Sequence, residues 1–211
     1  MLSFDFPRQV IYIYRNPKDV AVSYYHFAKM LTYIQFQGSF DHFLRMFLSE
    51  RGNYRFRKLF ACTLSATFLK SFLAPYSPYF PHLNDYIRLS KEKPDQYLTV
   101  CYEDMKENPF REIEKIAKFL DVTVDEKEVF EIAERTSFQA MKANPSTNYK
   151  HWDDFGLRNK RAKTEFLRKG IVGDHENHFT QQKWRDRIDE WIRIGTAESG
   201  LKFKFSISPD E

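Results

Sequence analysis

The feature that most constrains the fold of this chain is a short apolar run that ends in a cation and an asparagine–proline pair. Residues 9–14, Gln-Val-Ile-Tyr-Ile-Tyr, are β-branched and aromatic with almost no polar interruption. Such a strand is typical of a parallel sheet that is covered on both faces. Arg15 follows it, Asn16 is a good helix N-cap, and Pro17 suits the first helical position. The first thirty residues are therefore predicted to form a strand, a tight turn and a helix.

Strands and helices alternate along the rest of the chain. A second apolar run predicts a strand at 96–102, a proline-rich loop is expected at 74–81, and a long polar loop is expected at 144–163. Apolar residues recur at helical spacing in four more segments, 82–91, 109–120, 125–135 and 181–194. This order indicates an α/β fold with a parallel sheet, of which only two strands are clear in the sequence.

Composition and charge exclude several classes of partner. The chain has 211 residues, 42% of them hydrophobic and 29% charged, which fits one globular domain. Its formal net charge of +4 comes without the dense basic stripe of a nucleic-acid interface. The apolar run at 59–73 is too short to span a bilayer, and the N-terminus has no signal-peptide pattern. We therefore expect a cytoplasmic protein with no nucleic acid and no membrane as partner.

The two cysteines indicate neither a metal centre nor a disulfide framework. Cys62 and Cys101 lie far apart and have no metal-ligand spacing. Two reduced thiols in a reducing compartment are the simpler interpretation. No metal cofactor is expected.

The turn after the first strand is a candidate phosphate site. In an open α/β sheet, ligands bind at the carboxyl ends of the strands, where Arg15 stands. Ser23 lies two turns into the following helix. A guanidinium can contact two phosphate oxygens, and a serine hydroxyl can donate another hydrogen bond. The alternative is that Arg15 pairs with a carboxylate and Ser23 is only a small packing residue.

Two further segments carry groups that suit a nucleotide. Arg168 and Lys169 are adjacent cations, and the backbone of Gly170 can approach an anion closely. Alone, this pattern is equally that of a solvated surface turn. Tyr102 and the run 136–138 could hold a purine by stacking and edge contacts, with core aromatic residues as the alternative.

These segments occur together in an order that resembles the cytosolic sulfotransferase family. The similarity covers nearly the whole chain except roughly residues 50–73. It is carried by four motifs: the run 15–27 (RNPKDVAVSYYHF), the run 102–109 (YEDMKENP), the segment 136–149, and the Arg-Lys-Gly, Gly-Asp and His-Phe elements within 168–179. The resemblance implies a P-loop-type three-layer sandwich with a central parallel sheet.

The resemblance also implies a function and a set of binding residues. The family transfers a sulfonate group from 3′-phosphoadenylyl sulfate to a hydroxyl or amine of a small acceptor. By match, five residues would hold the 3′-phosphate of this co-substrate: Arg15, Ser23, Arg168, Lys169 and Gly170. The adenosine part would be contacted by Tyr102 and by the adenine-site residues Thr136, Ser137, Phe138 and Met141, while Phe166 begins the loop that folds over the nucleotide.

Some parts that the resemblance implies have no match in this chain. The family's first strand, its phosphosulfate-cradling loop and its general-base histidine would all precede Met1. We therefore predict an N-terminally truncated member of the family, a single domain over 1–211 in which no catalytic residue can be assigned. Residues 51–72 have no counterpart in the family pattern and are predicted to be an insertion.

Two alternatives to an active sulfotransferase belong to other classes. A non-catalytic remnant that at most binds the 3′-phosphoadenosine nucleotide would carry the same motifs. A P-loop kinase relative is disfavoured because the chain has no Gly-x-x-x-x-Gly-Lys-Ser/Thr. At the positions of the family's dimer motif only Thr180 matches, and Glu176 and Arg185 reverse its charges, so the usual homodimer is not expected.

Overall fold

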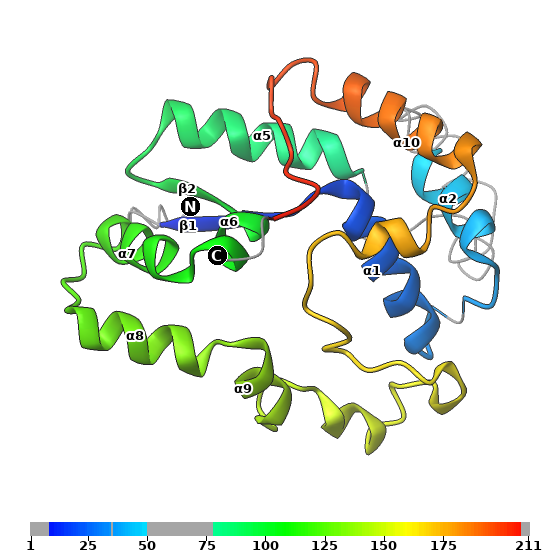
Figure 1. Cartoon of the computed structure of the whole chain (residues 1–211), viewed down its shortest axis with the longest axis horizontal. Coiled ribbons are helices and arrows are strands. Elements are labelled where there is room, and N and C mark those ends of the chain that lie inside the picture. Colours follow the sequence, from blue (N-terminus) through cyan, green and yellow to red (C-terminus); the bar gives the residue numbers. More distant parts are fainter. Residues whose placement is uncertain (1–8, 35, 50–77, 208–211) are drawn as a thin grey trace, which may run out of the picture.

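A pair of parallel strands lies at the centre of the computed structural model, which describes residues 9–34, 36–49 and 78–207 (Figure 1). Strand β1 (Val10–Tyr14) pairs with β2 (Tyr97–Cys101), so that Val10 lies opposite Tyr97 and Tyr14 opposite Cys101. These two strands form the sheet of the described ranges. The predicted insertion at 51–72 lies outside the described residues.

Helices lie on both sides of the strand pair, which confirms the α/β fold. Figure 1 shows α5 on one side of the strands and α6 and α7 on the other. The α-helices are α1 (Pro17–Met30), α2 (Phe40–Leu48), α5 (Tyr79–Glu92), α6 (Tyr102–Glu107), α7 (Pro109–Phe119), α8 (Glu126–Arg135), α9 (Phe138–Ala143) and α10 (Gln182–Gly195). Three 3-10 helices are η1 (Lys150–Asp153), η2 (Lys160–Ala162) and η3 (Asp174–Asn177). Within the described ranges, no helix combines the length and the apolar character needed to cross a bilayer.

The helix starts are fixed by side chains that accept hydrogen bonds from backbone N–H groups without a partner inside the helix. Asn16 Oδ1 accepts from the Asp19 N–H at 2.8 Å and so begins α1, as predicted. Asp125 and Glu128 form a reciprocal capping box at the start of α8. Ser137 Oγ accepts from the Ala140 N–H at 3.2 Å at the start of α9.

The main core lies between α1, α2, α5 and α10. Its buried apolar residues are Ala21, Val22, Ala28, Phe43, Leu44, Phe47, Leu48, Phe80, Leu83, Ile87, Phe179, Trp184, Ile188 and Trp191. Tyr12 and Tyr14 of β1 pack against this core. Ile13 points the other way, because successive side chains of a strand alternate between its faces, and it is 53% exposed. The expectation that the first strand is covered on both faces is therefore wrong at Ile13.

Several predicted boundaries are also wrong, for local reasons. The helix predicted at 82–91 begins at Tyr79. Pro81 is compatible with this earlier start, because it lies in the first turn, where a backbone N–H has no acceptor within the helix. The strand predicted at 96–102 ends at Cys101, since Tyr102 already belongs to α6. The polar loop predicted at 144–163 contains η1 and η2.

Two isoleucines on α10 test the placement of the core. Ile188→Ala is expected to lower the free energy of unfolding by about 2–4 kcal/mol, because its side chain is 0% exposed and its removal leaves a cavity. Ile194→Ala on the same helix is the matched control at 43% exposure, with an expected change of about 0.5 kcal/mol or less. Urea unfolding of both variants measures the difference. Equal losses would contradict the core described here.

Candidate functional site

Arg15, at the carboxyl end of β1, is held by contacts on several sides. Its Nη2 donates to Asp19 Oδ2 at 3.0 Å and to the Ile171 carbonyl at 2.6 Å. Its guanidinium lies over the Tyr102 ring, 4.4 Å from the ring centroid. Its Nε is buried without a hydrogen-bond partner, 3.9 Å from Glu103 Oε1. Arg15 does pair with a carboxylate, as the alternative interpretation proposed, and its Nε makes no hydrogen bond.

Asp19, in the first turn of α1, is the buried acceptor for several of these groups. Its carboxylate accepts from Arg15, from Asn16 Nδ2, from the Gly173 backbone N–H and from both the backbone and ring nitrogens of His175. Burial alone would raise the pKa of Asp19. The hydrogen bonds from His175 and Gly173 and the charge of Arg15 outweigh it and hold that pKa well below its usual range. Asp19 is therefore an anion at neutral pH.

Glu103 ties the end of β2 to the end of β1. Its fully buried carboxylate accepts from the Asn16 backbone N–H at 2.9 Å and from Asn16 Nδ2 at 2.8 Å. The Cys101 thiol donates to Glu103 Oε2 at 3.1 Å. Burial, together with this neighbouring carboxylate, raises the pKa of Cys101 to about 11. Cys101 is therefore a protonated, inert thiol.

Arg168, Lys169 and Gly170 form a basic loop before η3, and a buried carboxylate organises this loop as well. Arg168 Nη2 and Lys169 Nζ each lie 2.5 Å from an oxygen of Asp174. Burial would raise the pKa of Asp174, but hydrogen bonds from Lys169, Arg168 and Asn177 bring it down to about 2. The loop is therefore an ordered ion-pair cluster rather than a solvated turn.

Gly170, within this loop, is required by both its backbone and its surroundings. Its φ is +67°, a conformation that residues with a Cβ rarely adopt. A Cβ built there would lie 2.2 Å from Cδ2 of the Phe138 ring. Phe138 thus packs directly on the glycine backbone and joins α9 to the basic loop.

A cavity of about 300 Å³ lies beside α1 and the basic loop. Its lining residues are Arg15, Val20, Ser23, Tyr24, His26, Phe27, Met30, Glu165, Phe166 and Arg168. Arg15, Ser23 and Arg168 supply cationic and hydroxyl groups, while Tyr24, Phe27 and Phe166 supply aromatic surface. The arrangement can hold an anionic group next to an apolar one.

The structure brings part of the predicted site to this cavity. Arg15, Ser23, Phe166 and Arg168 line it, although they come from distant parts of the sequence. Lys169 contacts Asp174 beside Arg168, outside the cavity lining.

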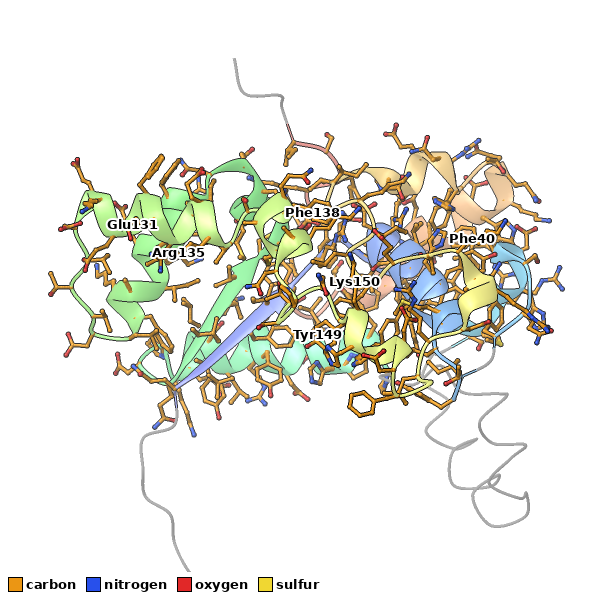
Figure 2. All side chains as sticks on the ribbon, turned by 90° about the horizontal axis from the view of Figure 1, so that it is seen from below. Phe40, Glu131, Arg135, Phe138, Tyr149 and Lys150 are labelled. Atoms are coloured by element: carbon orange, nitrogen blue, oxygen red, sulfur yellow. The ribbon has the colours of Figure 1, made fainter. Side chains whose placement is uncertain are left out.

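The predicted adenosine residues do not line the cavity. Tyr102 lies against Arg15, and Phe138 lies against Gly170 near the middle of the molecule (Figure 2). The Thr136 hydroxyl donates back to the Ile132 carbonyl at 2.7 Å, and Ser137 caps α9.

Met141, the last of this predicted set, contributes a backbone group. Its carbonyl accepts from Thr147 Oγ1 at 2.6 Å. Tyr149, which Figure 2 shows near the middle of the molecule, lies 4.3 Å from the Phe166 ring, centroid to centroid. The role of these residues in adenosine binding stays a prediction.

Sequence reasoning missed the buried carboxylates Asp19, Glu103 and Asp174 and their partner His175. In the sequence, Asp19 stands only within the run 15–27 and Glu103 only within the run 102–109, and neither was assigned a binding role. The available signal was position, because Glu103 lies just after β2 and Asp19 lies in the first turn of the helix that follows β1.

Cationic, hydroxyl and aromatic side chains thus surround one cavity at the end of β1 in an α/β fold. Residues 4–202 match the family described as the sulfotransferase domain. The chain belongs to this family.

Individual relatives agree. Mouse sulfotransferase 1B1 is 39% identical over 195 residues, which are 92% of this chain and 56% of that protein. Human sulfotransferase 1E1 is 34% identical over 199 residues, 94% of this chain and 58% of that protein. The chain therefore spans a little more than half of the length of these relatives.

Solved structures share the fold. A retinol dehydratase in complex with androsterone and the inactive cofactor PAP has a TM-score of 0.72 at 24% identity, covering 92% of this chain and 49% of the other. A mouse sulfotransferase complexed with PAP has a TM-score of 0.67 at 24% identity, covering 92% and 60%. Among the described residues, no group of three or more His, Cys, Asp or Glu side chains could hold a metal ion.

His26 in the cavity wall gives the site a pH-dependent stability. Burial, reinforced by the charge of Arg168, lowers the pKa of His26 to about 4, against about 6.5 in an unfolded chain. The unfolded state therefore binds more protons between these values, and the free energy of unfolding falls as the pH drops from about 6.5 towards 4. Between pH 7 and pH 5, His26→Gln is expected to lose about 1 kcal/mol less than the parent, after discounting for solvent screening. Urea unfolding at both pH values measures this, and identical pH dependence in the two proteins would contradict it.

Proposed function

We propose that this chain binds 3′-phosphoadenylyl sulfate, and that the protein transfers its sulfonate group to a hydroxyl or amine of a small acceptor. The observation that carries the proposal is that Arg15, Ser23 and Arg168 line one cavity at the end of β1. The match to the sulfotransferase domain over residues 4–202 supports the same reaction class. When bound, the co-substrate supplies the sulfonate group.

The residues at the cavity fit a phosphate monoester. A dianion needs several cationic donors, and two arginines reach this space. The Arg15 side chain is 21% exposed, so part of its guanidinium can be reached by an incoming oxygen. Gly170 follows Lys169 in the same loop, and the Phe138 ring covers the side where a Cβ would stand. We assign the 3′-phosphate to these groups together with Ser23 and Lys169.

The adenosine part is assigned to the aromatic and hydroxyl groups around this phosphate site. Phe138 packs on Gly170, so the helix that carries it lies next to the phosphate-binding loop. Tyr102 supports the Arg15 guanidinium from below. The remaining proposed contacts are Thr136, Ser137, Met141 and Phe166. Three of the structural neighbours were solved with PAP, which supports a nucleotide as the ligand.

The acceptor is proposed to be a small molecule with an apolar body. Tyr24, Phe27 and Phe166 give the cavity an aromatic wall next to its cationic end. The neighbours solved with retinol and with androsterone bind compounds of this kind. A cytoplasmic location, a single domain with an insertion at 51–72, and the absence of the usual homodimer remain predictions.

Substitution of Arg15 tests the proposed nucleotide binding. Arg15→Ala is expected to weaken binding of 3′,5′-adenosine diphosphate by about 10- to 100-fold, because hydrogen bonds to charged groups contribute about 1.5–3 kcal/mol each. Isothermal titration calorimetry measures the affinity. The control is Arg88→Ala, which removes an exposed arginine that pairs with Asp85 and Glu92 on α5. Equal affinities of parent and Arg15→Ala would refute the role of Arg15.

The alternative function, a chain that binds the nucleotide without transferring sulfonate, is separated by a turnover assay. The chain is incubated with labelled 3′-phosphoadenylyl sulfate and a simple phenol, and the sulfated product is measured. Turnover excludes the non-catalytic alternative. Nucleotide binding without turnover supports it for this chain.

A further inference from the structure

One buried carboxylate connects the two parts of the proposed phosphate site. Asp19 Oδ2 accepts from Arg15 Nη2 at 3.0 Å and from the Gly173 backbone N–H at 2.9 Å. Asp19 Oδ1 accepts from the His175 backbone N–H at 2.9 Å and lies 3.0 Å from His175 Nδ1. Because an ionised carboxylate only accepts, Nδ1 is the donor in the last contact. Asp19 thus holds Arg15 on one side and the segment that follows the basic loop on the other.

The positions of the phosphate-binding groups depend on this connection. Arg15 Nη2 also donates to the Ile171 carbonyl at 2.6 Å, one residue after Gly170. Asp174, which holds Arg168 and Lys169, lies between the two residues whose backbone N–H groups bind Asp19. The side chain of Asp19 is 1% exposed, so its donors have no water to replace it.

We propose that Asp19, together with the imidazole of His175, is a positioning residue that docks the basic loop onto the start of α1 and so sets the affinity for a 3′-phosphate. The inference rests on the proposed nucleotide function. Asp19 acts through Arg15 and the loop, and it has no place among the residues that line the cavity. His175 contacts Asp19 through its ring as well as its backbone, so substitution of the ring tests the same docking independently.

A purely electrostatic role of Asp19 would change the phosphate affinity in the opposite direction. If Asp19 only neutralised Arg15, removing its negative charge would strengthen binding of a phosphate dianion. Docking predicts weaker binding, because the amide of Asp19→Asn turns one of the two acceptor atoms into a donor. That NH₂ group would face N–H donors that are already in place, and buried donors without acceptors are unfavourable. The direction of the change therefore separates the two roles.

The test compares two nucleotides on the full chain by calorimetry. The probes are 3′,5′-adenosine diphosphate and adenosine 5′-monophosphate, which differ only in the 3′-phosphate. Asp19→Asn is expected to weaken binding of the diphosphate by about 10-fold and His175→Ala by about 5-fold, with less than about 2-fold change for the monophosphate. A general loss of folded protein would reduce both affinities alike. The ratio of the dissociation constant for the monophosphate to that for the diphosphate therefore reports positioning.

Three variants complete the design. His175→Asn supplies a side-chain amide donor and is expected to recover part of the loss seen in His175→Ala. Glu112→Gln is the matched control, since Glu112 is a buried carboxylate on α7 that pairs with Arg111 and Lys115 and leaves the ratio unchanged. Asp174→Asn loosens the cations themselves and is expected to lower the ratio as Asp19→Asn does.

The outcomes separate this inference from the proposed function. A parent protein that does not prefer the diphosphate contradicts the proposed nucleotide site itself. A parent that prefers it, with the same ratio in Asp19→Asn, overturns the positioning role alone. Tighter binding of the diphosphate by Asp19→Asn overturns it as well and assigns Asp19 to neutralisation.

Discussion

The structure depends on two carboxylates that are buried at the carboxyl ends of adjacent parallel strands. Glu103 follows β2 and accepts hydrogen bonds from the backbone N–H and the side-chain amide of Asn16, which follows β1. Asp19 then accepts from Arg15 and from the distant Gly173 and His175. Buried charges are tolerated only when they are paired and fully hydrogen-bonded, so this network fixes the geometry around it. The strand ends, the start of α1 and the basic loop are held as one unit.

The larger elements could be predicted from the sequence because their signals are local. The β-branched run of β1 and the Asn16–Pro17 start of α1 lie where the pattern placed them. The helices α6 and α9 escaped prediction because each has only six residues, too few for a helical period to show. The exposure of Ile13 was beyond prediction as well, because apolar composition does not reveal which face of a strand is covered.

The candidate site was predictable in its cations and unpredictable in its anions. Arg15 and Arg168 stand out because positive charges at a strand end and beside a glycine indicate an anion site, and the structure brings both to one cavity. Asp19 and Asp174 look like ordinary surface acids in a chain that has 29 acidic residues. Only the tertiary fold shows that they are buried and which cations they pair with. Thr136 illustrates the converse case, a hydroxyl that the motif singles out and that the structure shows bonded to its own helix.

The pairing of Arg168 and Lys169 with Asp174 has a consequence for how ionic strength would act on this site. Cations that face water gather mobile anions, and a ligand gains free energy by displacing them, which makes its affinity steeply salt-dependent. Here a carboxylate of the chain already occupies both cations at 2.5 Å. An arriving phosphate would therefore meet cations whose charge Asp174 already balances, and it would release few ions to the solvent. The affinity of the site should therefore vary less with salt than its number of positive charges suggests.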